Sequence, residues 1–256
     1  MALHLVLVEP AGPLNVGSVA RLCANFGVDS LRLVAPRCDP GDEEARRMAV
    51  GGRPLLARAS RHGDLREALA DCRRVVACSG RGVGEPLAAQ SPQQALAWLL
   101  AGPGPLALVF GREDRGLSND ELLQAGRLLR IASHPDCPSL NLSHAVAVVL
   151  HELQTLRDLP ETAEARLVPP PQAAAEPTAD PCPRGELEAA LRDAEALLLE
   201  VGFLLPHTAH ARMQKLRGLL QRSLPSRAEV ALLRGIVAQM RWASRHPDPG
   251  RTAQDH

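Results

Sequence analysis

Short apolar runs alternate with segments of helical periodicity over the first 160 residues of the chain. The runs stop at proline, glycine or a charged residue, which is typical of buried strands. They predict strands at residues 3–8, 31–35, 74–78, 106–110 and 128–131. Apolar residues three or four positions apart predict helices at residues 15–26, 64–70, 92–100 and 141–156. Strands that alternate with helices predict an α/β domain, residues 1–160, with a parallel sheet flanked by helices on both faces.

The pattern changes after the last of these helices. Residues 161–183 are rich in proline, alanine and acidic side chains, and three prolines at 169–171 exclude a helix or a central strand there. We interpret this segment as a semi-rigid linker. Beyond it, helical periodicity at residues 185–201, 210–221 and 226–242 predicts a small helical extension over residues 184–245.

Charge and cysteine content narrow the class of protein. Acidic and basic residues are balanced at 29 each, which argues against a protein that coats nucleic acid through its overall charge. Residues 212–245 nevertheless carry eight basic side chains and one acid, Glu229, which fits either a phosphate backbone or a solvated surface. The six cysteines have no metal-site or C-x-x-C spacing, and we find no leader-like start and no run of membrane length. We therefore expect no metal and a reducing, cytoplasmic compartment.

Three polar segments lie where a parallel sheet of this type binds ligands, beyond the carboxyl ends of its strands. Residues 15–21 read Asn-Val-Gly-Ser-Val-Ala-Arg, residues 108–117 read Leu-Val-Phe-Gly-Arg-Glu-Asp-Arg-Gly-Leu, and residues 138–145 read Pro-Ser-Leu-Asn-Leu-Ser-His-Ala. Each has a structural explanation by itself. Asn15 is a plausible helix cap, the second segment is a charged turn, and Ser139 or Asn141 would cap the last helix.

Taken together, in this order and spacing, the three segments resemble the motifs of the SpoU-type RNA 2′-O-methyltransferases of the SPOUT superfamily. Residues 199–203, 213–217 and 232–237 (Leu-Glu-Val-Gly-Phe, Met-Gln-Lys-Leu-Arg and Leu-Leu-Arg-Gly-Ile-Val) further resemble the C-terminal extension of the TrmJ-type tRNA enzymes. The resemblance covers most of the chain outside the linker and the last dozen residues. It implies a C-terminal trefoil knot, here over residues 75–156, and a homodimer formed through the knot region.

The resemblance also implies a reaction and a set of residues. The reaction is 2′-O-methylation of a tRNA ribose, at cytidine or uridine 32 of the anticodon loop, with S-adenosylmethionine as methyl donor. The cofactor contacts implied are Ser79, Gly80, Gly111, Glu113, Gly116, Ile131, Ser139, Leu140 and Ala145. Arg21 is the implied catalytic arginine, in a composite site of two subunits. The residues implied around the reacting ribose are Asn15, Glu113, Ser139 and Asn141.

A mechanism follows for Arg21 as a hypothesis. A neutral hydroxyl is a poor nucleophile, so negative charge that develops on its oxygen must be stabilised. A guanidinium stays protonated and is therefore unsuited as a base. We expect Arg21 to orient the ribose and stabilise charge, while the proton leaves through water or phosphate.

The basic helices are expected to bind the tRNA backbone by charge. The candidate RNA contacts are Arg21, Arg212, Lys215, Arg217, Arg222 and Arg234. Because the chain has no Tyr, three Phe and two Trp, an aromatic stacking platform is not expected.

Other functions remain open at this point. The chain could methylate another tRNA position or rRNA, or could be a catalytically silent RNA-binding module. A dehydrogenase is weakly indicated by the glycines at 80, 82 and 84, but Glu85 and Leu87 stand where a third spaced glycine is needed. A metallohydrolase is weaker still, because His151 lacks a second histidine four positions on.

Overall fold

The computed structural model describes residues 2–80, 87–158 and 180–246. Its centre is a sheet of seven parallel strands in the order β3-β2-β1-β6-β4-β7-β5. The strands are β1 (Leu3–Val8), β2 (Ser30–Val34), β3 (Ser60–His62), β4 (Arg74–Cys78), β5 (Ala89–Gln90), β6 (Leu106–Phe110) and β7 (Arg127–Leu129). The parallel α/β architecture expected from the alternating pattern is therefore confirmed.

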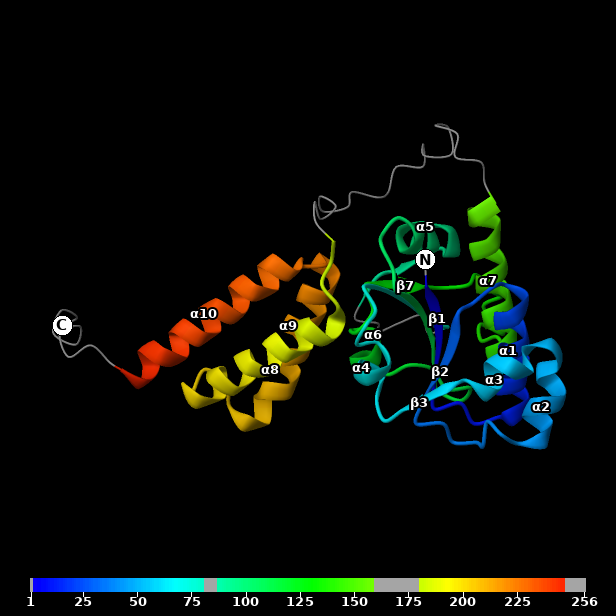
Figure 1. Cartoon of the computed structure of the whole chain (residues 1–256), viewed down its shortest axis with the longest axis horizontal. Helices are drawn as coiled ribbons and strands as arrows, with labels where there is room; N and C mark the ends of the chain where they lie inside the picture. The colour runs from blue at the N-terminus through cyan, green and yellow to red at the C-terminus, as the bar shows by residue number, and fades with distance from the viewer. Residues whose placement is uncertain (1, 81–86, 159–179, 247–256) are drawn as a thin grey trace.

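Helices cover both faces of the sheet (Figure 1). Leu3, Leu5 and Leu7 face one layer and Val6 and Val8 the other, because successive side chains of a strand point to opposite faces. The first layer contains α1 (Pro13–Asn25), α2 (Glu43–Ala49), the 3₁₀ turn η1 (Val50–Gly52), α3 (Arg53–Ala57), α5 (Pro92–Leu100) and α7 (Leu142–Asp158). The second contains α4 (Leu65–Ala68) and α6 (Asn119–Leu122).

Gly17 and Gly52 allow the backbone of α1 to lie in direct contact with the backbones of α2 and η1. A Cβ atom at Gly17 would lie 2.1 Å from the carbonyl oxygen of Ala45 on α2. A Cβ atom at Gly52 would lie 2.3 Å from the carbonyl oxygen of Ala20 and 2.6 Å from the amide nitrogen of Arg21. Gly17 and Ala20 of the first motif thus allow α1 to pack closely on α2 and η1. As a result, η1 lies directly against the backbone that carries Arg21.

The helical extension consists of α8 (Arg184–Glu200), α9 (Pro206–Ser223) and α10 (Arg227–Arg245), which lie to one side of the sheet (Figure 1). It has its own small core, formed among others by Leu191, Met213 and Val230. Its first helix is attached to the α/β domain through backbone hydrogen bonds, of which that from Gly185 N to Ala70 O measures 2.8 Å. The side chain of Arg184 is buried there and donates to the carbonyl oxygen of Gln124.

Several expectations from the sequence need correction. Helix α1 begins at Pro13 with Gly12 as its N-cap, so Asn15 lies inside the first turn and is not the cap. Helix α4 is shorter than expected, and α2, η1, α3, β3, β5 and α6 were not anticipated. Their runs are too short or too polar to show a clear period. Residues 161–179, which are most of the expected linker, and the glycine positions 82 and 84 lie outside the described residues.

Candidate active site

A pocket of about 520 Å³ opens at the carboxyl edge of the sheet, where β6, β4 and β7 end side by side. Volumes of this order are usual for sites that bind small molecules and cofactors. The pocket brings together every residue that the sequence suggested for the cofactor, although they come from four separate segments. These residues are Ser79, Gly80, Gly111, Glu113, Gly116, Ile131, Ser139, Leu140 and Ala145.

Parallel strands explain why these segments converge. Ser79 follows β4, Gly111 follows β6 and Ile131 follows β7, and all three strands run in the same direction. Ser139 and Leu140 precede α7, whose first turns supply Leu142 and Ala145 to the same pocket. The wall therefore combines apolar side chains with hydroxyl and carboxylate oxygens, a combination that suits a ligand with both an aromatic and a charged part.

Two glycines allow the loop after β6 to form a tight turn in which its backbone segments are in direct contact. A Cβ atom at Gly111 would lie 2.4 Å from the carbonyl carbon of Gly116 and 2.5 Å from the amide nitrogen of Leu117. Gly116 has a φ of +66°, which favours glycine. The amide of Gly116 donates to the carbonyl oxygen of Arg112 at 2.9 Å. This motif segment therefore requires glycine at both positions for steric reasons.

Arg112 anchors this loop to the end of β1. Its guanidinium donates to both oxygens of Glu121, at 2.8 and 2.9 Å, and also to Glu9. Arg37 donates to Glu9 as well, at 2.7 Å. The hydrogen bond from Arg112, partly opposed by burial and supported by Arg37, lowers the pKa of Glu9 to about 2. The carboxylate is thus charged at neutral pH, and the ion network holds the loop in place.

Glu113 links this loop to the start of α1. Its carboxylate accepts hydrogen bonds from the amides of Ala11 at 3.0 Å and Gly12 at 3.2 Å, and from Nδ2 of Asn15 at 3.0 Å. Burial raises the pKa of Glu113, but the hydrogen bonds from Ala11, Asn15 and Gly12 outweigh it and hold the pKa below its ordinary value. Glu113 is therefore an anion that orders the first motif.

Asn141 connects the third motif to the same network. Its Nδ2 donates to Oδ1 of Asn15 at 3.1 Å. Its own Oδ1 accepts from the amide of Ser143 at 2.9 Å and caps the first turn of α7. Glu113, Asn15 and Asn141 thus form one continuous chain of hydrogen bonds across positions more than 90 residues apart in sequence. Side-chain amides that are held on both sides have a defined orientation toward a substrate.

The pH dependence of stability offers a test of the role of Glu113. Because its pKa is lower in the folded protein than its ordinary value of 4.5, the stabilisation is complete above that value and is lost as the pH falls through the folded pKa. We expect Glu113→Gln to lower the thermal midpoint near pH 7 and the difference from wild type to shrink as the pH falls below 4.5. Thermal unfolding followed by circular dichroism measures this. Asp114→Asn removes the same charge from a side chain that is 61% exposed, and an equal effect in that control would refute the assignment.

Arg21 is placed differently from the rest of the motif residues. It lies on the exposed side of α1 and does not line the pocket. Within the part of the chain that the structure describes, its guanidinium has no hydrogen bond or ion pair. A single subunit therefore does not bring Arg21 together with the candidate cofactor residues.

The candidate RNA-binding residues of the helical extension differ in their exposure to solvent. Arg212, Lys215, Arg222 and Arg234 are exposed, as a phosphate-binding role requires. Arg217 is only 4% exposed, and its Nε donates to Glu188 at 2.8 Å. The expectation that Arg217 contacts RNA is thus wrong, because this side chain stabilises the packing of α9 on α8. A signal was present in the sequence, since Arg217 lies one turn after the apolar Met213 on the same helix face.

Sequence reasoning missed the anchoring residues around the pocket. Glu9 and Arg112 are separated by more than a hundred positions, and nothing local indicates that they meet. Phe110 and Leu142, which also line the pocket, lie within the motif segments but were not predicted to contact the ligand. Their role depends on which end of the element faces the pocket, which only the fold defines.

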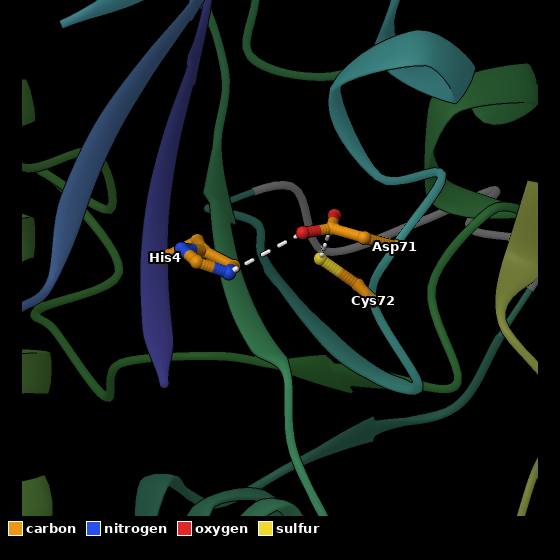
Figure 2. Close-up of side chains that lie close together, drawn as sticks. All are labelled: His4, Asp71 and Cys72. Carbon is orange, nitrogen blue, oxygen red and sulfur yellow. Dashed lines mark hydrogen bonds and ion pairs between the residues drawn. The ribbon is translucent and has the colours of Figure 1, made fainter. Parts of the chain in front are cut away.

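A second cluster, of His4, Asp71 and Cys72, lies at the opposite edge of the sheet, and Figure 2 shows the three side chains pointing toward one another. Their donor atoms lie within 4.8 Å of one another, close enough for a metal. However, the guanidinium of Arg32 donates to both oxygens of Asp71, at 2.6 and 2.8 Å, and so occupies the position of a cation. Burial also raises the pKa of the Cys72 thiol to about 12. The cluster fits an ion pair that supports the sheet better than a metal centre.

The fold and the pocket define a parallel α/β protein with a pocket of small-molecule size at the carboxyl edge of its sheet, where sheets of this type bind ligands. The chain belongs to the SpoU rRNA Methylase family, whose model matches residues 2–151, and the model of the tRNA methyltransferase TrmJ C-terminal domain matches residues 185–252. The resemblance inferred from the motifs is therefore confirmed. No helix among the described residues is long and apolar enough to cross a membrane.

Two TrmJ proteins resemble the chain over almost its full length, and a more distant methyltransferase shares the fold of part of it. The tRNA (cytidine/uridine-2′-O-)-methyltransferase TrmJ of Cronobacter sakazakii is 34% identical, over 96% of this chain and 98% of that protein. The crystal structure of TrmJ from Z. mobilis has a TM-score of 0.80 and 29% identity, and the match covers 94% of this chain and 99% of that one. The AdoMet complex of the SpoU methyltransferase AviRb from Streptomyces viridochromogenes shares the fold, with a TM-score of 0.51 and 20% identity over 61% of this chain and 58% of that one.

Proposed function

We propose that the protein transfers a methyl group from S-adenosylmethionine to the 2′-hydroxyl of a tRNA ribose, at cytidine or uridine 32 of the anticodon loop. The observation that carries this proposal is the hydrogen-bonded chain of Glu113, Asn15 and Asn141, which joins the three motif segments beside one pocket. The extension that matches the TrmJ C-terminal domain supports tRNA as the substrate.

The pocket residues fit S-adenosylmethionine by their chemistry. Ile131, Leu140 and Ala145 provide apolar surface for an adenine ring, and Ser79 and Ser139 provide hydroxyl groups. An added Cβ atom at Gly80 would meet only the Pro138 oxygen, at 3.8 Å, and Ser139, so a ligand can lie against this backbone. When bound, the cofactor supplies a methyl group on a positively charged sulfur.

The residues around the pocket would prepare the ribose for this transfer. Asn15 and Asn141 would orient the sugar through the amide groups that Glu113 and the start of α7 hold in place. Arg21 would place fixed positive charge beside the 2′-oxygen as negative charge develops there. Proton loss would proceed to water or an RNA phosphate, because a guanidinium does not accept the proton.

The position of Arg21 supports a homodimer as the active form. Arg21 is exposed outside the pocket of its own subunit, so a second subunit would have to supply it. Exposed apolar side chains of α1 and α7, Leu14 (50% exposed) and Val148 (37%), are available for burial in such an interface. α1 and α7 pack against each other within the subunit, and together they provide this surface. The knot over residues 75–156 stays a prediction, supported by the approach of Ser139 to the pocket beside Gly80.

The exposed basic side chains Arg212, Lys215, Arg222 and Arg234 would bind the tRNA backbone. A cytoplasmic location is part of the same proposal. It is supported by six free cysteines, of which Cys23 and Cys72 are fully buried thiols.

Mapping of ribose methylation tests the proposed function. Purified protein, radiolabelled S-adenosylmethionine and unmodified tRNA should yield a 2′-O-methyl group at position 32, detected by resistance of the neighbouring phosphodiester to alkaline hydrolysis. Methylation elsewhere in tRNA or in rRNA would change the substrate but not the reaction. Binding of both ligands without transfer would contradict the proposal and favour a silent RNA-binding module.

A further inference from the structure

A second hollow, of about 420 Å³, lies among α2, α3 and β3 and is lined by three arginines, one from each of these elements. Arg46 belongs to α2, Arg53 begins α3 and Arg61 lies in β3. The remaining lining is small or apolar and consists of Pro40, Gly41, Leu56, Ala57 and Ala59. None of these residues was indicated by the motifs, and the proposed function does not use them.

The charge of this hollow is incompletely balanced. Arg61 pairs with Asp39 at 3.2 Å. Arg53 uses its Nε to donate to the backbone oxygen of Arg46 at 3.0 Å, which orients the guanidinium and leaves its terminal nitrogens available. The described residues provide no hydrogen bond or ion pair for the side chain of Arg46. Arg46 and Arg53 thus line the hollow without a carboxylate partner among the described residues, and a bound anion would balance their charge.

One element of the hollow is connected to the backbone that carries the proposed catalytic arginine. Arg53 directly follows Gly52, where an added Cβ atom would be 2.6 Å from the amide nitrogen of Arg21. The backbones of Arg21 and Arg53 are therefore neighbours although they are far apart in sequence. The hollow therefore belongs to the part of the domain that packs against the segment carrying Arg21.

We propose that Arg46, Arg53 and Arg61 form a phosphate-binding subsite for the RNA backbone, on the part of the domain where η1 packs against the backbone of Arg21. This inference rests on the proposed function, since it takes RNA as the ligand. Guanidinium groups recognise phosphate oxygens through pairs of parallel N–H donors, which a compact ammonium group does not provide. The subsite would hold the backbone on the side of α1 and leave the extension to hold the rest of the tRNA.

A matched pair of double variants tests the subsite. Arg46→Gln with Arg53→Gln removes two charges inside the hollow. Arg47→Gln with Arg58→Gln removes two charges from exposed neighbours that do not line it, on α2 and directly after α3. All four side chains are exposed, so both variants should fold, which thermal unfolding checks. Fluorescence anisotropy with labelled full-length tRNA, at several KCl concentrations, measures the affinity and its dependence on salt.

The hollow variant should bind tRNA about 10-fold more weakly near 0.1 M salt, and its salt slope should fall by up to about 0.7 for each lost contact. The control variant should change both quantities by less than half as much. The KM for tRNA should rise while kcat at saturating tRNA changes by less than about twofold, because the subsite positions RNA and takes no part in transfer. Calorimetry should find the same affinity for S-adenosylmethionine in all three proteins.

Three outcomes would overturn the inference. Equal losses in the two variants would show a general effect of charge. Unchanged tRNA affinity in the hollow variant would remove the subsite from the RNA path, even if the wild-type hollow binds inorganic phosphate. A fall in kcat at saturating tRNA with unchanged affinity would assign the arginines to catalysis instead. Because RNA binding is measured without turnover, a chain that binds tRNA through this hollow but transfers no methyl group would refute only the proposed function.

Discussion

Replacement of Arg21 by alanine is expected to reduce methyl transfer to tRNA by about 100- to 1,000-fold at saturating substrates, the range seen when one group that stabilises developing oxyanion charge is removed. The side chain is exposed and lies outside the pocket, so neither the fold nor the affinity for S-adenosylmethionine should change. Transfer of radiolabelled methyl groups measures the rate, and calorimetry measures cofactor binding.

Arg21→Lys is the matched control for this experiment. It keeps the positive charge but loses the planar pair of donors, so we expect a rate between those of the wild type and of Arg21→Ala. Near-normal transfer by Arg21→Ala, with RNA binding intact, would remove Arg21 from the chemistry. Mixing Arg21→Ala subunits with subunits whose pocket is blocked tests the composite site, since mixed dimers would regain one complete site.

Gly111→Ala is expected to have the second large effect. The added Cβ atom would lie 2.4 Å from the backbone of Gly116, which cannot move aside as a flexible side chain could. Forcing an extra methyl group into such a contact costs about 1–3 kcal/mol. If the strain falls on the loop that lines the pocket, affinity for S-adenosylmethionine should fall by about 5- to 150-fold, which titration calorimetry measures.

The control for this variant is Gly51→Ala. An added Cβ atom at Gly51 meets no atom within 4 Å, so the same chemical change should leave cofactor affinity unaltered. Unchanged affinity in Gly111→Ala would mean that the loop after β6 does not shape the cofactor site. A lower thermal midpoint together with normal affinity would assign the glycine to folding alone.

The sequence predicted the grouping of the candidate cofactor residues, but it predicted neither the arginine-lined hollow nor the burial of Arg217. The candidate cofactor residues lie in one pocket because each follows a strand or begins a helix, and parallel strands bring these ends to one edge. The short elements between residues 43 and 62 escaped prediction, and with them the arginine-lined hollow. Lys215 and Arg217 are two positions apart, yet one is exposed and the other is buried against Glu188.

The amino-acid sequence by itself determined the parallel α/β architecture, the helical extension and the identity of the motif residues. These properties depend on the period of apolar positions and on glycine and capping residues, which act over a few neighbouring positions. Only the tertiary structure decided that Glu113 orders Asn15, that Arg21 lies outside the pocket and that Gly52, directly before Arg53, packs against its backbone. Such relations join segments that are distant along the chain, and their geometry depends on how whole helices and strands pack.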